Sequence, residues 1–233
     1  MPYIYGPIPS RRLGQSLGVD PILLKTCNWN CVYCQLGTDG AAHQRTAGVR
    51  PGMRSWRPCI MLGAPSRGDI DLRLVRGVGE PTLHVGLGWM LRRTKALTSI
   101  PVAVITNGSL LYRPDVRAEL AVADVVMPTL VAGTASLFRR INRPHPELTF
   151  ARQVDGLVQF RRREYAGKLW IEAMLIRDLN DDAGPHRAGR RVAADSARRG
   201  PHHVARPAAQ RNVGRAARRG RSHARHGHPG RHR

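Results

Sequence analysis

Short apolar runs alternate along this chain with stretches whose apolar residues recur at helical spacing. The runs predict five strands, at Ile22–Thr26, Asp69–Val75, Pro101–Thr106, Asp124–Val131 and Leu169–Ile176. The helical spacing predicts helices at Leu87–Leu97, Pro114–Ala121 and Gln153–Phe160. Strands that alternate with helices are typical of parallel βα units. The pattern therefore predicts an α/β fold.

Two segments break this pattern. Residues 38–76 offer no long amphipathic stretch where the first helix of such a fold is expected. Residues 183–233 hold 14 arginines, a single acid (Asp195) and no Leu, Ile, Met, Phe, Tyr or Trp. So few large apolar residues cannot offset an ordering entropy of about 1–2 kcal/mol per residue. We therefore predict a core of residues 1–182, with 38–76 divergent, and a disordered basic tail of residues 183–233.

Charge and composition leave two interpretations of these segments open. The formal net charge is +22, and only Lys25, Lys95 and Lys168 among the 38 basic residues are lysine. An arginine-rich arm could bind RNA phosphates. Alternatively, a GC-rich gene read out of frame would give the same mixture of Arg, Ala, Gly and Pro. Residues 38–76 are correspondingly a divergent insertion or an out-of-frame segment.

Composition also limits where the protein works. The sequence has no apolar run of about 18 residues, so we expect no membrane span. It also lacks a charged-then-apolar leader. We therefore expect a cytoplasmic protein.

Three cysteines carry the clearest chemistry. Cys27, Cys31 and Cys34 form a C-x3-C-x2-C run directly after the apolar residues 22–24. Three thiolates on one short loop can hold three irons of a cubane cluster and leave the fourth iron open to a bound ligand, whereas four-cysteine sites serve electron transfer. A loop after a strand lies at the carboxyl edge of the sheet, where barrel enzymes keep their active sites.

Simpler interpretations of the cysteines are a disulfide framework, a zinc site and redox thiols. The fourth cysteine, Cys59, stands alone, which argues against a disulfide framework. A structural zinc site needs a fourth ligand at matching spacing, and no second C-x2-C pair follows. The spacing therefore favours an iron-sulfur cluster, with Cys59 outside it.

Several motifs together resemble the radical S-adenosylmethionine (radical SAM) superfamily, most closely its wyosine-synthetase-like subgroup. The similarity covers residues 1–37 and about 77–182, and it lies in the stretches YGPIPSRRLGQSLGVD (5–20), KTC (25–27), CQLG (34–37), GEPTLH (79–84), VITNGSLLY (104–112) and FRRINRPHP (138–146). The resemblance implies a partial (β/α)6 TIM-like barrel. Its sixth strand should follow residue 182, where the pattern fails, so we expect the barrel to be incomplete at its C-terminal end.

The resemblance also implies cofactors and their ligands. Cys27, Cys31 and Cys34 match the ligands of a [4Fe-4S] cluster, whose open iron would bind S-adenosyl-L-methionine. Further positions match residues that contact this cofactor: Tyr33, Gly77, Gly79, Glu80, Asn107, Thr129 and Glu172. Tyr33 would lie near the adenine, and the glycine-rich turn ending at Glu80 would receive the methionyl ammonium. Taken alone, Gly-x-Gly-Glu is a turn pattern, Asn107-Gly108 is typical of turns, and Glu172 could be a solvated strand residue.

Three further positions qualify this picture. The stretch at residues 127–134 resembles a family stretch in which aspartate stands where this chain has Val131. The difference removes a hydrogen-bond acceptor that would position substrate or cofactor. His84 and His145 lie in matching motifs, where they could transfer protons or simply structure their loops.

The implied activity is reductive cleavage of S-adenosylmethionine to a 5′-deoxyadenosyl radical that acts on a substrate. Its partners would be an electron donor such as flavodoxin or ferredoxin, and RNA is a candidate substrate through tRNA modification. The alternative is a catalytically compromised iron-sulfur or RNA-binding remnant of such an enzyme, since segments of the core depart from the family. Whether the chain is an active enzyme thus stays open at this stage.

Overall fold

The computed structural model describes residues 4–10, 13–37, 71–75 and 78–181. Gly77, Cys59, the segment 38–70 and the predicted tail at 183–233 lie outside the described residues. The sixth parallel strand expected after residue 182 lies outside them as well.

The described strands form one sheet in chain order. The strands are β1 (Ile4–Ser10), β2 (Gly14–Val19), β3 (Leu72–Val75), β4 (Val102–Thr106), β5 (Val125–Pro128) and β6 (Lys168–Leu169). The pair β1–β2 is antiparallel, and every later neighbouring pair is parallel. A sheet whose strands follow one another in sequence order is built like part of a barrel, whereas a doubly wound sheet reverses its order midway.

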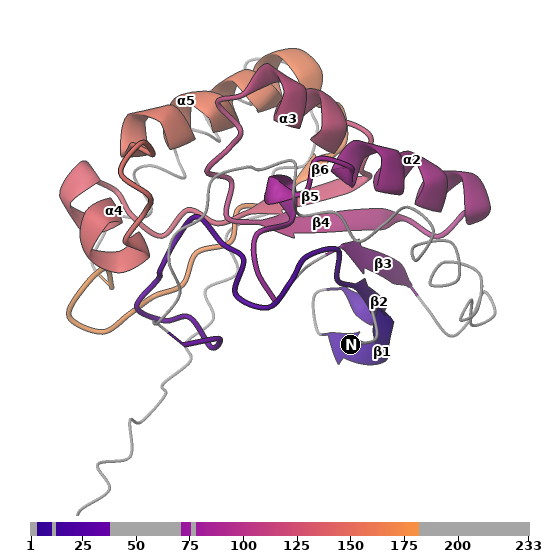
Figure 1. Cartoon of the computed structure of the whole chain (residues 1–233), viewed down its shortest axis with the longest axis horizontal. Coiled ribbons are helices and arrows are strands. Elements are labelled where there is room, and N and C mark those ends of the chain that lie inside the picture. Colours follow the sequence, from indigo (N-terminus) through magenta and orange to yellow (C-terminus); the bar gives the residue numbers. More distant parts are fainter. Residues whose placement is uncertain (1–3, 11–12, 38–70, 76–77, 182–233) are drawn as a thin grey trace, which may run out of the picture.

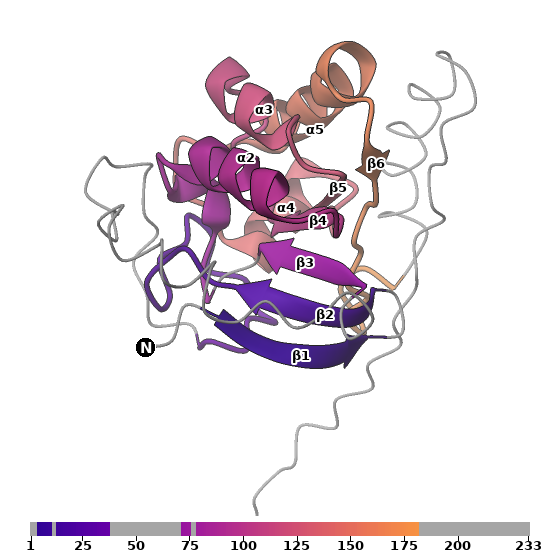
Figure 2. The same ribbon diagram turned by 90° about the vertical axis from the view of Figure 1, so that its right-hand side faces the viewer.

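Helices cover one face of this sheet (Figure 1). The described helices are η1 (Pro81–Leu83), α2 (Leu87–Leu97), α3 (Pro114–Leu120), α4 (Ala135–Asn142), α5 (Phe150–Gln159) and the π-helical turn η2 (Phe160–Glu164). The view in Figure 2 shows α2, α3 and α5 on the same side of the strands. Threonine side chains cap two of the helices, since Thr134 accepts from the amide of Leu137 and Thr149 from that of Arg152.

The core follows from the alternation of residues in the strands. On β4, Val102 and Val104 join the large cluster under the helices, while Ala103 packs on the opposite face with Val125 and Met127. Both faces of the central strands are therefore buried, which explains the continuous apolar run of β4.

The prediction of a first strand at Ile22–Thr26 is wrong. Ile22 is buried, but Leu23 and Leu24 are 67% and 55% exposed, and Lys25 has a positive φ of 64°. The strand that precedes the cysteines is β2, whose two glycines hide its β character from sequence analysis. Gly18 is required there, because a Cβ would collide with the ring of its cross-strand partner Tyr5.

Two further elements differ from the prediction. Helix α4 was not predicted, and the last strand is shorter than the expected Leu169–Ile176. Beyond β6 the chain still pairs with β5, because the Trp170 and Glu172 amides donate to the carbonyls of Val126 and Pro128. The other predicted elements agree with the structure to within three residues at each end, and the mixed α/β class is confirmed.

Candidate functional site

The cysteine loop leaves the carboxyl end of β2 and is held first by the segment after β3. The Asp20 carboxylate accepts from the amides of Ile22 (3.3 Å) and Val78 (3.0 Å). The Lys25 amide donates to the Val78 carbonyl (2.6 Å), and the Glu80 amide donates to the Thr26 carbonyl (2.8 Å). This backbone contact is so close that a Cβ on Gly79 would collide with the Thr26 carbonyl. Gly79 thus lets two loops meet at the sheet edge.

The second half of the loop is held by residues 141–145, which we call the α4 clamp. The amides of Asn30 and Val32 donate to the carbonyls of Asn142 (3.0 Å) and Ile141 (2.9 Å). In return, the His145 amide donates to the Asn28 carbonyl (2.9 Å). The motif at residues 138–146 therefore positions the cysteines.

Hydrogen-bond donors approach two of the three sulfurs. The Trp29 amide lies 3.4 Å and Asn107 Nδ2 lies 3.7 Å from Cys27 Sγ, and Asn142 Nδ2 lies 3.5 Å from Cys31 Sγ. Such N–H donors stabilise thiolates and tune the clusters that they hold. Asn142 was not predicted, although it lies within a quoted motif.

Burial disfavours the thiolate forms of Cys27 and Cys31. Burial raises the pKa of Cys27 to about 12, with a further contribution from the Glu80 carboxylate. Burial likewise raises the pKa of Cys31. Binding of a metal centre must therefore displace these protons, which couples metal affinity to pH.

The arrangement of the donors distinguishes a cluster from a single ion. Among the described residues, no three His, Cys, Asp or Glu side chains form a group that could hold a metal ion. A cubane cluster takes its three thiolates on three different irons and does not need them to converge. Three partly buried cysteines on one loop, with N–H donors on two sulfurs, are the residues that could hold such a cluster.

Glu80 is a buried carboxylate that links the segment after β3 to the end of β4. Its side chain is 2% exposed and accepts four hydrogen bonds, from the Thr82 amide (3.0 Å) and hydroxyl (2.6 Å), the Thr106 hydroxyl (2.6 Å) and the Asn107 amide (2.6 Å). Burial raises its pKa, and these donors oppose the shift. All four donors belong to the protein, so Glu80 organises the edge. Its contact with a methionyl ammonium stays a prediction.

Asn107 lies at the centre of the carboxyl edge. Its Nδ2 donates to Asn28 Oδ1 (2.8 Å), and its Oδ1 accepts from the Ser109 amide (2.9 Å). Gly108, and not Asn107, has the positive φ, at 74°. The Asn107 side chain thus takes part in the turn through the Ser109 amide and also approaches Cys27 Sγ. Both interpretations of Asn107 therefore hold.

A buried glutamine joins the ends of β4 and β5. Gln153 on α5 is 2% exposed, and its Nε2 donates to the carbonyls of Asn107 (3.2 Å) and Thr129 (2.8 Å). Sequence analysis placed Gln153 in a helix but assigned it no role. Its position on the apolar face of that helix was the available signal.

The remaining predicted residues also gather at this edge. Thr129 and Glu172 form an isolated parallel bridge. Burial raises the pKa of Tyr33, and the charges of Cys31 and Glu172 contribute, so phenol, thiol and carboxylate are neighbours. The structure therefore brings every described predicted residue to one edge, although contact with S-adenosylmethionine stays a prediction.

The two histidines and Val131 have structural environments. Nδ1 of His84 accepts from the Gly86 amide (2.9 Å), and Nδ1 of His145 accepts from the Glu147 amide (3.4 Å). These contacts fit loop-structuring roles. Val131 is 1% exposed, and its carbonyl accepts from Nδ2 of the buried Asn180 (2.8 Å).

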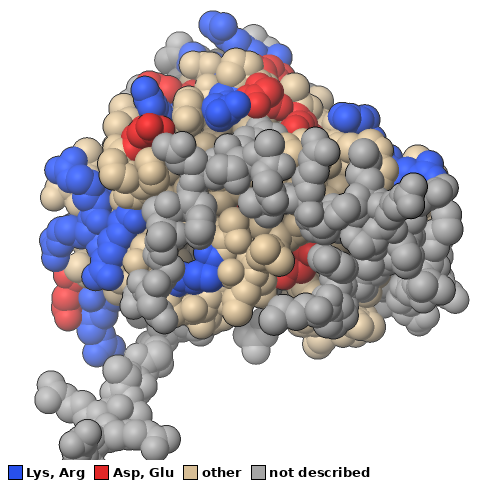
Figure 3. All heavy atoms as spheres, viewed as in Figure 1, with Lys and Arg blue, Asp and Glu red and all other residues tan. Residues whose placement is uncertain are grey.

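Arginines surround the outer side of the α4 clamp. Arg139, Arg140 and Arg143 are exposed, and within the described part of the chain none of them forms an ion pair. Figure 3 shows Lys and Arg atoms gathered on the side of the molecule where α4 lies. An electropositive surface therefore adjoins the cysteine loop.

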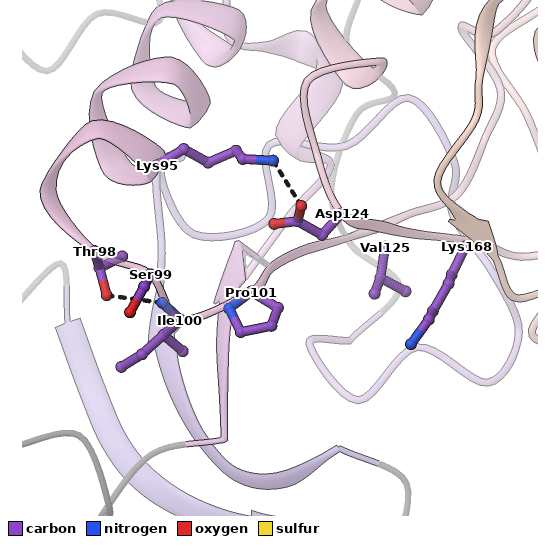
Figure 4. A pocket seen from close by; sticks show the side chains of 8 residues that line it. All are labelled: Lys95, Thr98, Ser99, Ile100, Pro101, Asp124, Val125 and Lys168. Carbon is purple, nitrogen blue, oxygen red and sulfur yellow. Dashed lines mark hydrogen bonds and ion pairs between the residues drawn. The ribbon is translucent and has the colours of Figure 1, made fainter.

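The opposite, amino edge of the sheet is different in kind. Lys95, on α2, donates to Asp124 Oδ1 (2.6 Å) in an exposed ion pair, and Asp124 Oδ2 accepts from the Val102 amide (2.8 Å). A depression of about 260 Å³ opens beside this pair (Figure 4), and it is lined by Lys95, Thr98, Ser99, Ile100, Pro101, Asp124, Val125 and Lys168. None of the predicted site residues lies there.

Sequence comparison gives relatives that match about three quarters of this chain. The chain is 35% identical over 177 residues to the UPF0026 protein MJ1312 of Methanocaldococcus jannaschii, covering 76% of this chain and 54% of that protein. It is 35% identical over 182 residues to the UPF0026 protein slr1464 of Synechocystis, covering 75% and 65%. A scan against known protein families finds no match.

A third relative has a different name. The chain is 40% identical over 181 residues to a Brachyspira hyodysenteriae protein named GTPase Obg, covering 76% of this chain and 26% of that protein. The sequence contains no G-x4-G-K-[S/T] phosphate loop. This chain spans between about a quarter and two thirds of the length of these relatives.

Structural comparison identifies the fold. The structure of TYW1 with a lysine-pyruvate adduct bound superposes with a TM-score of 0.54 at 18% identity, covering 78% of this chain and 63% of that one. Streptococcus suis SuiB bound to S-adenosylmethionine superposes with a TM-score of 0.52 at 18% identity, covering 77% and 38%. This chain therefore shares the fold of these two proteins, a radical SAM fold, and the resemblance predicted from its motifs is confirmed at the level of the fold.

No helix in the described ranges is both long and apolar enough to cross a membrane.

Proposed function

We propose that this chain is a radical SAM protein that binds a [4Fe-4S] cluster through Cys27, Cys31 and Cys34. The observation that carries the proposal is the half-buried three-cysteine loop at the carboxyl edge of a radical SAM fold, with N–H donors on two sulfurs. With S-adenosylmethionine bound, such a cluster supplies reductive cleavage to a 5′-deoxyadenosyl radical. The protein's own contribution is to place the thiolates and exclude water.

The residues of the edge divide this work. Asn107 and Asn142 donate to two sulfurs, and Glu80 and Gln153 fix the backbone of Asn107. Tyr33 and Glu172 lie near Cys31, and we propose that they contact S-adenosylmethionine. Because most of these groups are buried and hydrogen-bonded, the site would be formed before the cofactors bind.

Anaerobic reconstitution tests the proposal. We expect four irons and four sulfides per chain, and 5′-deoxyadenosine when dithionite and S-adenosylmethionine are added. A chain that binds the cluster but forms no 5′-deoxyadenosine would favour the second candidate, a non-catalytic iron-sulfur remnant. Val131 favours this second candidate. It is a buried valine at the position where the similar family stretch has aspartate, so this chain lacks that carboxylate. Absence of iron would contradict both.

The cleavage needs one electron from outside, and we propose an acidic donor such as flavodoxin or ferredoxin. Arg139, Arg140 and Arg143 adjoin the loop that would hold the cluster, so a negatively charged donor is attracted to the nearest surface. Stopped-flow reduction of the cluster by flavodoxin tests this. The rate should fall steeply with salt and fall further when the three arginines are changed to glutamine.

RNA is our proposed substrate class, in line with the wyosine-type resemblance. The same exposed arginines could neutralise phosphates, and binding would then weaken linearly in log–log plots against salt. Binding of transfer RNA and of a DNA duplex of equal charge should be compared at several salt concentrations. Equal affinities at every salt concentration would show only non-specific charge attraction and would contradict an RNA substrate.

A further inference from the structure

Two buried donors flank Cys27 in the sequence. Lys25 Nζ and Trp29 Nε1 are both inaccessible to solvent and make no hydrogen bond with any residue that the structure describes. They belong to residues two before and two after the first cysteine, and Trp29 is 4% exposed. Buried donors are nearly always paired, so two unpaired donors in a five-residue segment indicate an acceptor other than the described residues.

The nearby carboxylates are already in use. Asp20 accepts two backbone amides, and Glu80 accepts four hydrogen bonds from other residues. No ion pair in the described part of the chain involves Lys25. A buried ammonium without a counter-charge is strongly unfavourable. The described residues therefore supply no counter-charge for the Lys25 side chain.

The backbone at Lys25 gives an independent indication. Its φ of 64° places a long-chain residue in the left-handed region, where glycine or asparagine is usual. The Lys25 amide is bonded to the Val78 carbonyl, so the surrounding structure maintains this conformation. Strain that is maintained at one residue is typical of functional sites.

We propose that Lys25 is the internal counter-cation of the iron-sulfur cluster, with Trp29 Nε1 as a second donor to it. This inference rests on the proposed function. A cubane cluster with three thiolate ligands carries net negative charge, and its sulfurs accept N–H donors, so it supplies both the missing charge and the missing acceptor. A fixed positive charge favours the reduced, more negative state and therefore raises the reduction potential.

The test uses the full chain, reconstituted anaerobically without S-adenosylmethionine. Midpoint potentials are measured by redox titration monitored by electron paramagnetic resonance. The Lys25→Met variant should keep its iron. The equilibrium constant for reducing its cluster should fall about tenfold, which is a shift of about −59 mV in midpoint potential for one electron. Lys25→Arg should stay near the unaltered chain, and Trp29→Phe should shift in the same direction by less.

Lys168→Met is the matched control, because it removes the same charge at the amino edge of the sheet (Figure 4). Equal potentials for Lys25→Met and Lys168→Met would overturn the proposal. An unchanged potential together with weaker S-adenosylmethionine binding would also overturn it, since the ammonium would then serve that cofactor. If the Lys25→Met variant takes up no iron, the midpoint potential of the Trp29→Phe variant tests the proposal instead. A Trp29→Phe potential equal to that of the unaltered chain would overturn it. Absence of iron in the unaltered chain would instead contradict the proposed function itself.

Discussion

The two edges of this sheet are stabilised by different kinds of polar contact. At the carboxyl edge, Glu80, Gln153 and Asn142 are at most 2% exposed and reach backbone or sulfur atoms from other elements. At the amino edge, Lys95 and Asp124 form an ion pair whose side chains are 39% and 37% exposed. Water can replace a partner lost from the exposed pair but cannot reach one lost from the buried network. The comparison predicts that equivalent substitutions have unequal effects at the two edges.

The largest effect is expected at the sulfurs. Replacing Cys27, Cys31 or Cys34 by alanine should each abolish the reconstituted cluster, because three thiolates are its whole proposed ligand set. Cys59→Ala should leave the iron content unchanged. Iron and sulfide analysis measures this, and loss of iron on changing Cys59 would show that the ligand set is misassigned.

Next in size is Glu80→Gln. The amide presents an N–H₂ group where the carboxylate accepted hydrogen bonds, so at least one buried donor loses its acceptor at a cost of about 1–3 kcal/mol in the free energy of unfolding. Chemical denaturation measures the loss. The exposed residue Glu147 provides a control, and Glu147→Gln should change stability by less than about 0.5 kcal/mol. Equal losses for both variants would contradict the comparison.

Glu80 also predicts a pH dependence. Because burial raises its pKa in the folded chain above the usual 4.5, the folded state binds this proton more tightly than the unfolded state does. The contribution of Glu80 to stability is therefore fully present below about pH 4.5 and declines as pH rises through the raised pKa. The stability difference between the unaltered chain and Glu80→Gln should shrink over that range. A difference that grows with pH would show that the hydrogen bonds outweigh burial.

A smaller loss is expected for Gln153→Leu. The substitution leaves the carbonyls of Asn107 and Thr129 without their side-chain donor at a cost of about 1–2 kcal/mol. Gln159 lies on the same helix and is exposed, so Gln159→Leu is the matched control and should be nearly neutral. Thermal unfolding of both variants would measure the difference.

The smallest effect is expected at the amino edge. Lys95→Ala removes an exposed ion pair, which contributes about 0–1 kcal/mol and less at high salt. Asp124 keeps its bond to the Val102 amide in this variant. A loss as large as that of Gln153→Leu would mean that the two edges do not differ in the way proposed.

The sequence predicted the elements whose pattern is local. The run at Val102–Thr106 and the helical spacing at Leu87–Leu97 are visible in any short window, and the cysteine spacing is equally local. Strand β2 was missed because its glycines have low strand propensity and because only the Tyr5 ring explains one of them. Leu23 and Leu24 form an apolar run that resembles a strand, but both side chains are exposed. Their exposure depends on the tertiary structure and is not visible in the sequence.

The candidate site was predicted in its ligands but not in its supporting residues. Asn28, Asn142 and Gln153 are polar and have no distinctive spacing in the sequence. Gln153 and its partner Asn107 are 46 residues apart in the chain, and Asn142 and its partner Cys31 are 111 residues apart. A buried polar side chain is recognised by its partner, and the partner is known only from the fold.

The α4 clamp has a consequence for the order of folding. Cys31 and Asn142 are separated by 111 residues, so their contact has high contact order and forms late. During synthesis the cysteine loop leaves the ribosome well before the clamp does. In that interval Cys27 is solvated and has the ordinary thiol pKa of about 8.5, whereas burial later raises its pKa to about 12. We therefore expect the Cys27 thiol to be more reactive before the domain is complete than after it.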